Sequence, residues 1–200
     1  RQLFAAEGRH LTQMVGEFEK PTYFAYKERL CAHGRNRKRG CNACVEVCSA
    51  GAIAGAGDLV AVNPYLCAGC GACTTVCPTG ALGYAYPGAA HTGMRVKALL
   101  NAFAQAGGRE PVLLVHGADG AALLDAGGAL PGRVLPLDVH HMASTGIDIW
   151  LAALAWGAAG VAVLMTDAEA PQYAAALDDQ MTIAQTIMTG LGYAGSHVQL

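Results

Sequence analysis

The position of the cysteines constrains this chain more than any other feature, because all eight lie between Cys31 and Cys77. Disulfide frameworks of small secreted proteins usually spread cysteines over the whole chain, whereas these form one dense run of CxxC steps. The sequence begins at Arg1, and no signal-peptide pattern opens it. We therefore expect reduced, metal-binding thiolates in a cytoplasmic protein, and the absence of an initial Met suggests a piece of a longer polypeptide.

The second half of this segment has the more specific spacing. Its cysteines follow the pattern Cys67-x2-Cys70-x2-Cys73-x3-Cys77, and Pro78 comes next. Two-residue gaps let a loop curl around a cube of four irons and present three thiolates to it, and the longer step then takes the chain away in another direction. Gly69 and Gly71 suit the unusual dihedral angles that such a loop requires.

The first half repeats this arrangement with two changes. The stretch CNACVEVCSAGAI (Cys41 to Ile53) aligns with CGACTTVCPTGAL (Cys70 to Leu82), and the cysteines are in register. The only cysteine before this repeat is Cys31, which is separated from Cys41 by nine residues instead of two. Ser49 follows Cys48 where Pro78 follows Cys77. The duplication predicts two similar halves that pack as a pseudo-symmetric pair.

On these motifs the segment resembles a bacterial 2[4Fe–4S] ferredoxin domain with a widened first loop. In two-cluster ferredoxins the fourth cysteine of each motif ligates the other cluster. The resemblance therefore implies two [4Fe–4S] clusters with crossed ligation. One cluster would take Cys31, Cys41, Cys44 and Cys77, and the other would take Cys67, Cys70, Cys73 and Cys48.

Two other metal-binding interpretations stay open. Structural zinc is often held by two CxxC pairs, but it gives no reason for three successive x2 or x3 steps or for the Cys77-Pro78 exit. A [3Fe–4S] cluster with three cysteines is the alternative at the motif that depends on Cys31. The insert between Cys31 and Cys41 reads AHGRNRKRG, and its basic run Arg35–Arg39 is either a solvated loop or a contact for an acidic redox partner.

Composition divides the chain into three expected parts. Residues 1–30 form an N-terminal helical segment, residues 31–88 form an α+β ferredoxin-like two-cluster domain, and residues 89–200 form a small three-layer α/β domain. In the middle part, strands are expected after each cysteine repeat and at Leu59–Val62, before the turn at Asn63-Pro64. The boundaries follow the end of the cysteines and a shift to Ala, Leu, Val and Gly.

The last part is expected to hold about three parallel strands. Continuous apolar runs occur at 112–115, 134–139 and 161–165. Such runs are typical of strands in a parallel sheet that is covered on both faces. A helix ended by Gly107-Gly108 precedes them, and another begins near Pro171. Between the second and third strands, Thr145 and Asp148 predict a capping box at the start of a helix that ends at Gly157.

Polar residues follow these strands, at the edge where open α/β sheets bind ligands. His116, Gly117 and Asp119 follow the first strand, Asp138, His140 and His141 end the second, and Thr166 and Asp167 follow the third. From this set we predict a second site made of His116, His140, His141 and Asp167, although Asp167 and either Ser144 or Thr145 could also simply cap helices. No GxGxxG, P-loop or GxSxG motif is present.

The stretch from Val134 to Leu164 is similar to the delta subunit of methyl-viologen-reducing hydrogenase and related parts of heterodisulfide reductase. In that family a cysteine set in the α/β domain carries a further [2Fe–2S] cluster. This chain has no cysteine there, and His140 and His141 stand near the expected place. The resemblance thus implies a domain that docks to a partner rather than one that holds a third cluster.

Together these features predict an electron-transfer module, a carrier rather than a catalyst in itself, that exchanges electrons with redox protein partners. A redox enzyme whose α/β domain binds a substrate or flavin is the first alternative, and a structural zinc module is the second. A net charge of −2 argues against a nucleic-acid partner. The longest apolar run, Trp150 to Met165, is broken by glycines, so no membrane insertion is expected.

Overall fold

The computed structural model describes residues 19–35 and 38–200. The predictions for residues 1–18 and for Arg37 therefore lie outside the described residues. The cysteine region contains β1 (Phe24–Tyr26), η1 (Glu28–Leu30), β2 (Gly34–Arg35), β3 (Lys38–Arg39), α2 (Ala43–Glu46), β4 (Ile53–Ala56), β5 (Leu59–Val62), α3 (Ala72–Thr75) and β6 (Leu82–Tyr84). The strands expected after each cysteine repeat and at Leu59–Val62 are all present.

The duplication extends beyond the aligned repeat. In each half a strand comes first, a cysteine loop and a short helix follow, and a second strand ends the unit: β1, α2 and β4, then β5, α3 and β6. In both pairs, β1–β6 and β4–β5, the first strand of one half lies antiparallel to the last strand of the other half. The cysteine loops are thereby fixed by two small sheets.

Strand β1 departs from the helical segment predicted for residues 1–30. Phe24 and Tyr26 pack against the small core of this region, and Ala25 between them is exposed. This alternation has the period of a strand. Three residues are too few to show a helical pattern, and they pair with β6 instead. Within the described part of that segment, the aromatic run is therefore a strand of the cysteine region.

The remaining elements form an α/β unit. They are α4 (Ala89–Gln105), β7 (Val112–His116), α5 (Ala118–Gly127), β8 (Val134–Asp138), η2 (Met142–Ser144), α6 (Ile147–Ala155), β9 (Gly160–Val163), α7 (Pro171–Gly190) and β10 (Val198–Gln199). The sheet is parallel, with strand order β10–β9–β7–β8. Its three long strands lie where the apolar runs predicted them, and the two-residue edge strand β10 was too short to leave a sequence pattern.

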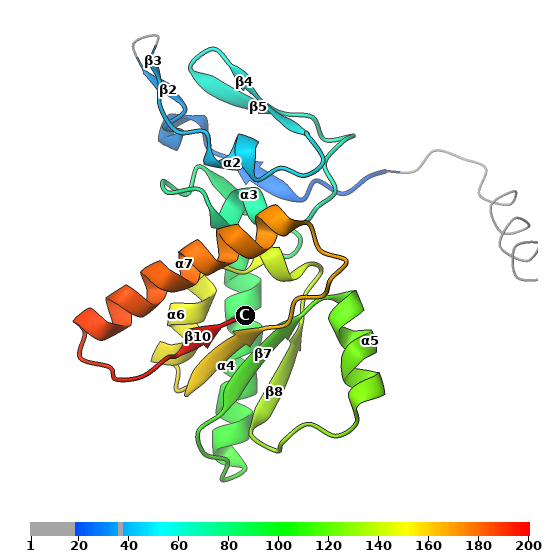
Figure 1. Cartoon of the computed structure of the whole chain (residues 1–200), viewed down its shortest axis with the longest axis vertical. Coiled ribbons are helices and arrows are strands. Elements are labelled where there is room, and N and C mark those ends of the chain that lie inside the picture. Colours follow the sequence, from blue (N-terminus) through cyan, green and yellow to red (C-terminus); the bar gives the residue numbers. More distant parts are fainter. Residues whose placement is uncertain (1–18, 36–37) are drawn as a thin grey trace, which may run out of the picture.

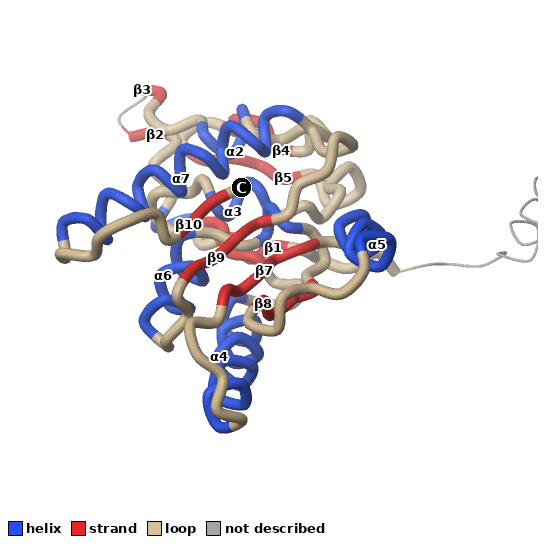
Figure 2. Tube along the Cα trace, turned by 60° about the horizontal axis from the view of Figure 1, so that its bottom comes forward, coloured by secondary structure: helices blue, strands red, loops and turns tan. Residues whose placement is uncertain are grey.

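Helices lie on both sides of this sheet. Figure 2 shows α5 on one side of the strands and α4 and α6 on the other. Helix α6 contacts both α4 and α7, so these three helices form one layer over the buried face that includes Leu113, Val115 and Val163. None of the helices in the described ranges is both long and apolar enough to cross a membrane.

The start of α6 differs from its prediction. Gly146 is the residue before the first turn, and the Thr145 side chain does not cap the helix. Instead, the buried Thr145 hydroxyl donates to the Met142 carbonyl (3.0 Å) and accepts from the Trp150 indole N–H (3.3 Å). The capping-box prediction was wrong because the Thr145 hydroxyl instead accepts a hydrogen bond from the buried Trp150 indole. Gly157 follows the end of the helix with φ of +103°, as predicted.

The cysteine region lies directly on the α/β unit. Figure 1 shows it at the top, with α7 between it and the sheet. The large hydrophobic core, which includes Trp150 and Val96, continues into this region through Val47 and Ala72. Packing is therefore continuous across residue 88, where composition predicts a domain boundary.

Candidate metal centres

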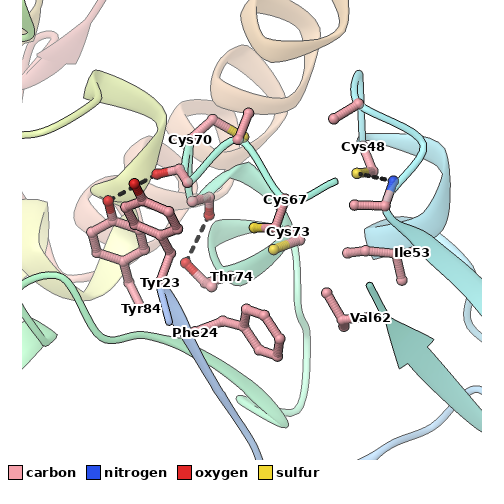
Figure 3. A pocket seen from close by; sticks show the side chains of 15 residues that line it. Tyr23, Phe24, Cys48, Ile53, Val62, Cys67, Cys70, Cys73, Thr74 and Tyr84 are labelled. Carbon is pink, nitrogen blue, oxygen red and sulfur yellow. Dashed lines mark hydrogen bonds between the residues drawn. The ribbon is translucent and has the colours of Figure 1, made fainter. Parts of the chain in front are cut away.

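Four cysteines line a cavity on the side of the cysteine region that faces the α/β unit. They are Cys48, Cys67, Cys70 and Cys73, and we call this space the inner cavity. Figure 3 shows three of them on one wall and Cys48 on the facing wall, with Phe24, Ile53 and Val62 closing the floor. The inner cavity is thus a thiol-lined space with apolar walls.

The other four cysteines line a second cavity, which we call the outer cavity. They are Cys31, Cys41, Cys44 and Cys77. Tyr26, Val60 and Leu82 provide its apolar walls. In both cavities three cysteines come from one motif and the fourth comes from the other, since Cys48 reaches the inner cavity and Cys77 the outer one.

The loop that carries Cys67, Cys70 and Cys73 is shaped by two glycines with left-handed backbones. Gly69 has φ of +78° and Gly71 has φ of +80°. A Cβ at Gly69 would lie 2.7 Å from the Tyr23 ring, and one at Gly71 would lie 2.6 Å from the Ser144 Cα. The loop is therefore held between Tyr23, which precedes β1, on one side and η2 of the α/β unit on the other, and the positive φ angles favour glycine at both positions.

Backbone amides donate to the fourth cysteine of each motif. The Ala52 N–H points at the Cys48 sulfur (3.2 Å), and the Leu82 N–H points at the Cys77 sulfur (3.5 Å). Ala52 stands four residues after Cys48 and directly precedes β4, and Leu82 stands five residues after Cys77 and is the first residue of β6. Such bonds stabilise negative charge on sulfur, as a thiolate ligand requires.

The thiols differ in how readily they lose a proton. Burial, with the neighbouring thiols of the outer cavity, raises the pKa of Cys44 to about 11. Burial and the three other inner-cavity thiols also raise the pKa of Cys73 well above its usual value. Burial opposes ionisation of Cys77 as well, but hydrogen bonds from Leu82, Thr79 and Ala81 outweigh it and lower its pKa. Metal binding must therefore displace protons from the thiols of Cys44 and Cys73.

The donor set fits iron–sulfur clusters. Zinc held by four cysteines needs every sulfur at about 2.3 Å from one ion. Within residues 19–35 and 38–200, no group of three or more His, Cys, Asp or Glu side chains is gathered closely enough to hold a single ion. Four thiols spread around each of two cavities are instead the ligand number and type that a [4Fe–4S] cube takes.

The insert between Cys31 and Cys41 folds as a hairpin on top of the cysteine region. Its strands β2 and β3 pair, and the Gly34 N–H donates to the Asp58 carbonyl (3.1 Å) at the turn between β4 and β5. The buried His33 lines the outer cavity, and its Nδ1 hydrogen-bonds with the Cys41 carbonyl (2.9 Å). The widened loop is therefore anchored at its base, and His33 is a residue that cysteine spacing could not reveal.

The structure does not bring the residues of the predicted second site together. His140 stacks on the Tyr23 ring, with ring centres 5.3 Å apart, whereas the His141 Nε2 lies 3.1 Å from a carboxylate oxygen of Glu169. His116 is buried beside Gly117, and Asp167 is exposed in the turn after β9. Burial lowers the pKa of His141, although Glu169 opposes the shift. No cluster of metal-ligating side chains forms there among the described residues.

Comparisons with known proteins bear on the cysteine region alone. No curated protein and no solved structure matches the chain significantly. The model of one family, described as a 4Fe-4S binding domain, matches residues 59–82, which cover β5, the three-cysteine loop, α3 and Cys77. The chain therefore carries a ferredoxin-like iron–sulfur domain that binds at least one [4Fe–4S] cluster.

Proposed function

We propose that this chain transfers electrons through two [4Fe–4S] clusters, one in each thiol cavity, as a module of a larger redox protein or complex. The observation that carries the proposal is the division of the eight cysteines into two cavities with four thiols each. The matched family model covers only the second motif. The repeat extends the same chemistry to the first motif, because its cysteines occupy equivalent positions.

In this proposal the cysteines are ligands and the surrounding residues exclude water. Cys48, Cys67, Cys70 and Cys73 would hold the inner cluster, and Cys31, Cys41, Cys44 and Cys77 would hold the outer one. A bound [4Fe–4S] cluster supplies one-electron transfer at a potential set by charge, hydrogen bonds and solvent access. The amides of Ala52 and Leu82 would lower the cost of the added negative charge.

The connection between the cavities favours transfer between them. Cys44 of the outer cavity and Cys48 of the inner cavity are four residues apart on α2 and the turn that follows it. Along a helix four residues rise by about 6 Å, so the two sites are neighbours. Cys73 on α3 and Cys77 just after it repeat this relation. An electron entering at either cavity therefore has a short path to the other.

Anaerobic purification followed by iron and sulfide quantification and EPR of the reduced protein tests this function. We expect about eight irons per chain and two interacting spins. About four irons would reduce the proposal to one cluster. A colourless protein with stoichiometric zinc would replace it with the structural module, and a flavin spectrum would favour the enzyme.

A further inference from the structure

A groove separates helix α7 from helix α2, at the boundary between the cysteine region and the α/β unit. Its volume is about 640 Å³. Ala43 and Glu46 line it on α2, and Ala175, Asp179 and Ile183 line it on α7. Figure 1 shows α7 lying across the cysteine region, below α2 and α3. We call this space the α2–α7 groove.

Two valines that line the groove stand next to cysteines of both cavities. The repeat aligns Val47 with Val76, and both belong to the lining. Val47 directly precedes Cys48 of the inner cavity, and Val76 directly precedes Cys77 of the outer cavity. A molecule seated in the groove would therefore be within one residue, along the chain, of a ligand of each proposed cluster.

The wall that α7 provides is fixed in place. The buried face of the helix, which includes Leu177, packs into the large core. At its first turn the Tyr173 hydroxyl hydrogen-bonds with the hydroxyl of Ser49, 124 residues earlier in the chain. Ser49 directly follows Cys48, so this bond ties α7 to the first cysteine motif. The groove is therefore formed before any other molecule enters it.

A row of apolar side chains runs from the groove along the open side of α7. Ile183, Ile187 and Leu191 follow one another at intervals of four residues, about one helical turn. They are 49%, 42% and 69% exposed. Singly exposed apolar residues are ordinary, but a contiguous row beside a groove is typical of a surface that another protein covers.

The charges around the groove indicate which kind of protein fits it. The exposed carboxylates of Glu46 and Asp179 stand on its two walls, and the described residues that line it include no Lys or Arg. Helix α7 carries Asp178 and Asp179 and no basic residue. The basic run Arg35–Arg39, in the insert beside the outer cavity, has the opposite sign. The groove therefore complements a positively charged surface.

The equivalent position of the second motif is already covered. Glu46 aligns with Thr75, whose methyl carbon would lie 3.2 Å from a Cβ added at Gly146, directly before α6. The α/β unit thus packs against the second motif at this position, whereas Glu46 is exposed. Of the two equivalent faces, the one that lines the groove is accessible to another molecule.

We propose that the α2–α7 groove is the docking site of a basic electron-transfer protein, which exchanges single electrons with the clusters at this point. In the direction tested below, a reduced cluster loses one electron and the partner's oxidised cofactor gains it, so no proton or further reactant is required. The inference rests on the proposed function, because the clusters supply the electron. It gives the module a partner surface whose charge is opposite to that of the basic run.

Cytochrome c, a small haem protein with a strongly basic surface, is the probe. The chain is purified anaerobically, its iron is quantified, and it is reduced with dithionite and separated from the reagent. Stopped-flow absorbance then follows the haem iron from Fe(III) to Fe(II). Glu46→Gln/Asp179→Asn removes the carboxylates of the groove, and Ile183→Ser removes its apolar edge. Glu110→Gln/Asp125→Asn is the matched control, because it changes the net charge equally and neither residue lines the groove.

At low salt we expect Glu46→Gln/Asp179→Asn to reduce cytochrome c at least about threefold more slowly than the parent chain, and the control to differ much less. This difference should vanish near 1 M salt, where the Debye length is about 3 Å. Ile183→Ser should slow the reaction at low and high salt alike, because apolar contacts are not screened. Oxidation by ferricyanide, an anion, should slow in none of these variants, since the clusters themselves are unchanged.

Equal rates for the parent chain and both groove variants, in iron-replete proteins, would overturn the docking site and leave the proposed function intact. A control as slow as Glu46→Gln/Asp179→Asn would also overturn it, because net charge alone would then steer the probe. If light scattering shows a parent dimer that Ile183→Ser dissolves, a second copy covers this face and the proposal is wrong. A parent chain without iron would instead remove the proposed function itself.

Discussion

The two thiol cavities have the same number of cysteines but different surroundings. The inner cavity lies against the α/β unit: its loop is held between Tyr23 and Ser144, and Cys70 and Cys73 pack against the large core. The described residues that line the outer cavity all belong to the cysteine region, and the strands of its widened loop pair at the end of the molecule that is farther from the sheet. One centre is therefore embedded and the other is peripheral.

This difference explains which of the two motifs keeps the standard spacing. The inner loop has a neighbour on each side, and at Gly71 even one methyl group would meet backbone. Residues inserted into such a loop would collide with these neighbours. The outer loop has a backbone hydrogen bond to the β4–β5 turn at its base, from the Gly34 N–H to the Asp58 carbonyl, and nine residues stand there where the other motif has two.

Paired cysteine substitutions should have the largest effect, because they remove whole clusters. In Cys48→Ala/Cys67→Ala both changes fall in the inner cavity, so we expect about four of about eight irons to remain. Cys44→Ala/Cys48→Ala changes one residue in each cavity and should leave almost no iron, although both residues belong to one motif. Iron quantification after anaerobic purification measures this, and the reverse ranking would show that ligation is not crossed.

The second-largest effect is expected when a methyl group is added to the loop that carries Cys67, Cys70 and Cys73. In Gly71→Ala the added Cβ would lie 2.6 Å from the Ser144 Cα, whereas Gly80→Ala meets nothing within 4 Å. Both positions have positive φ, +80° and +63°, so each variant carries a backbone cost of about 1–2 kcal/mol. The clash should add about 1–3 kcal/mol for Gly71→Ala only. Anaerobic denaturant unfolding compares the two, and equal losses would mean that η2 does not constrain the loop.

Removing the buried hydroxyl of Thr145, which follows η2, should have a smaller effect on stability. Thr145→Val leaves the Trp150 indole N–H and the Met142 carbonyl without this partner, which should lower the free energy of unfolding by about 1–3 kcal/mol. Thr186→Val is the matched control, because its hydroxyl bonds with the Thr182 carbonyl on the exposed face of α7. Thermal unfolding should fall clearly for the first variant and little for the second.

Local pattern predicted much of the scaffold and little of the contacts between its parts. The repeat and the apolar runs indicated β4 to β9, and periodicity indicated α4 and α7, because these signals lie within short windows of sequence. Strands β1 and β10 were missed, since two or three residues form a strand only when a distant partner pairs with them.

The candidate sites show the same limit. Cysteine spacing led to the thiols but not to Tyr173, because its contact with Ser49 joins residues 124 positions apart. Thr145 looked like a helix cap for the same reason: the indole that engages it is specified by packing and not by the T-x-x-D pattern. Ser49 was noticed in the sequence only as a missing proline, and its partner supplies the physical reason for the exchange.

The smallest expected effect concerns the basic hairpin beside the outer cavity. Replacing Arg35, Arg37, Lys38 and Arg39 with Gln removes four positive charges from the loop between Cys31 and Cys41. With fewer cations nearby, we expect the outer cluster to become slightly harder to reduce while the inner one stays unchanged. Oxidation of the reduced protein by anionic ferricyanide should slow a few-fold at low salt, and oxidation by a cationic hexaammine complex should not.

Ionic strength separates an electrostatic effect from a structural one in this variant. At 0.1 M salt, charges farther apart than about 10 Å are largely screened, so the difference between the parent chain and the variant should shrink as salt is added. A difference that persists at high salt would indicate a changed loop instead. If neither the potentials nor the two rates change at low salt, the hairpin is only a solvated surface. The basic residues then have no electrostatic effect on the outer centre.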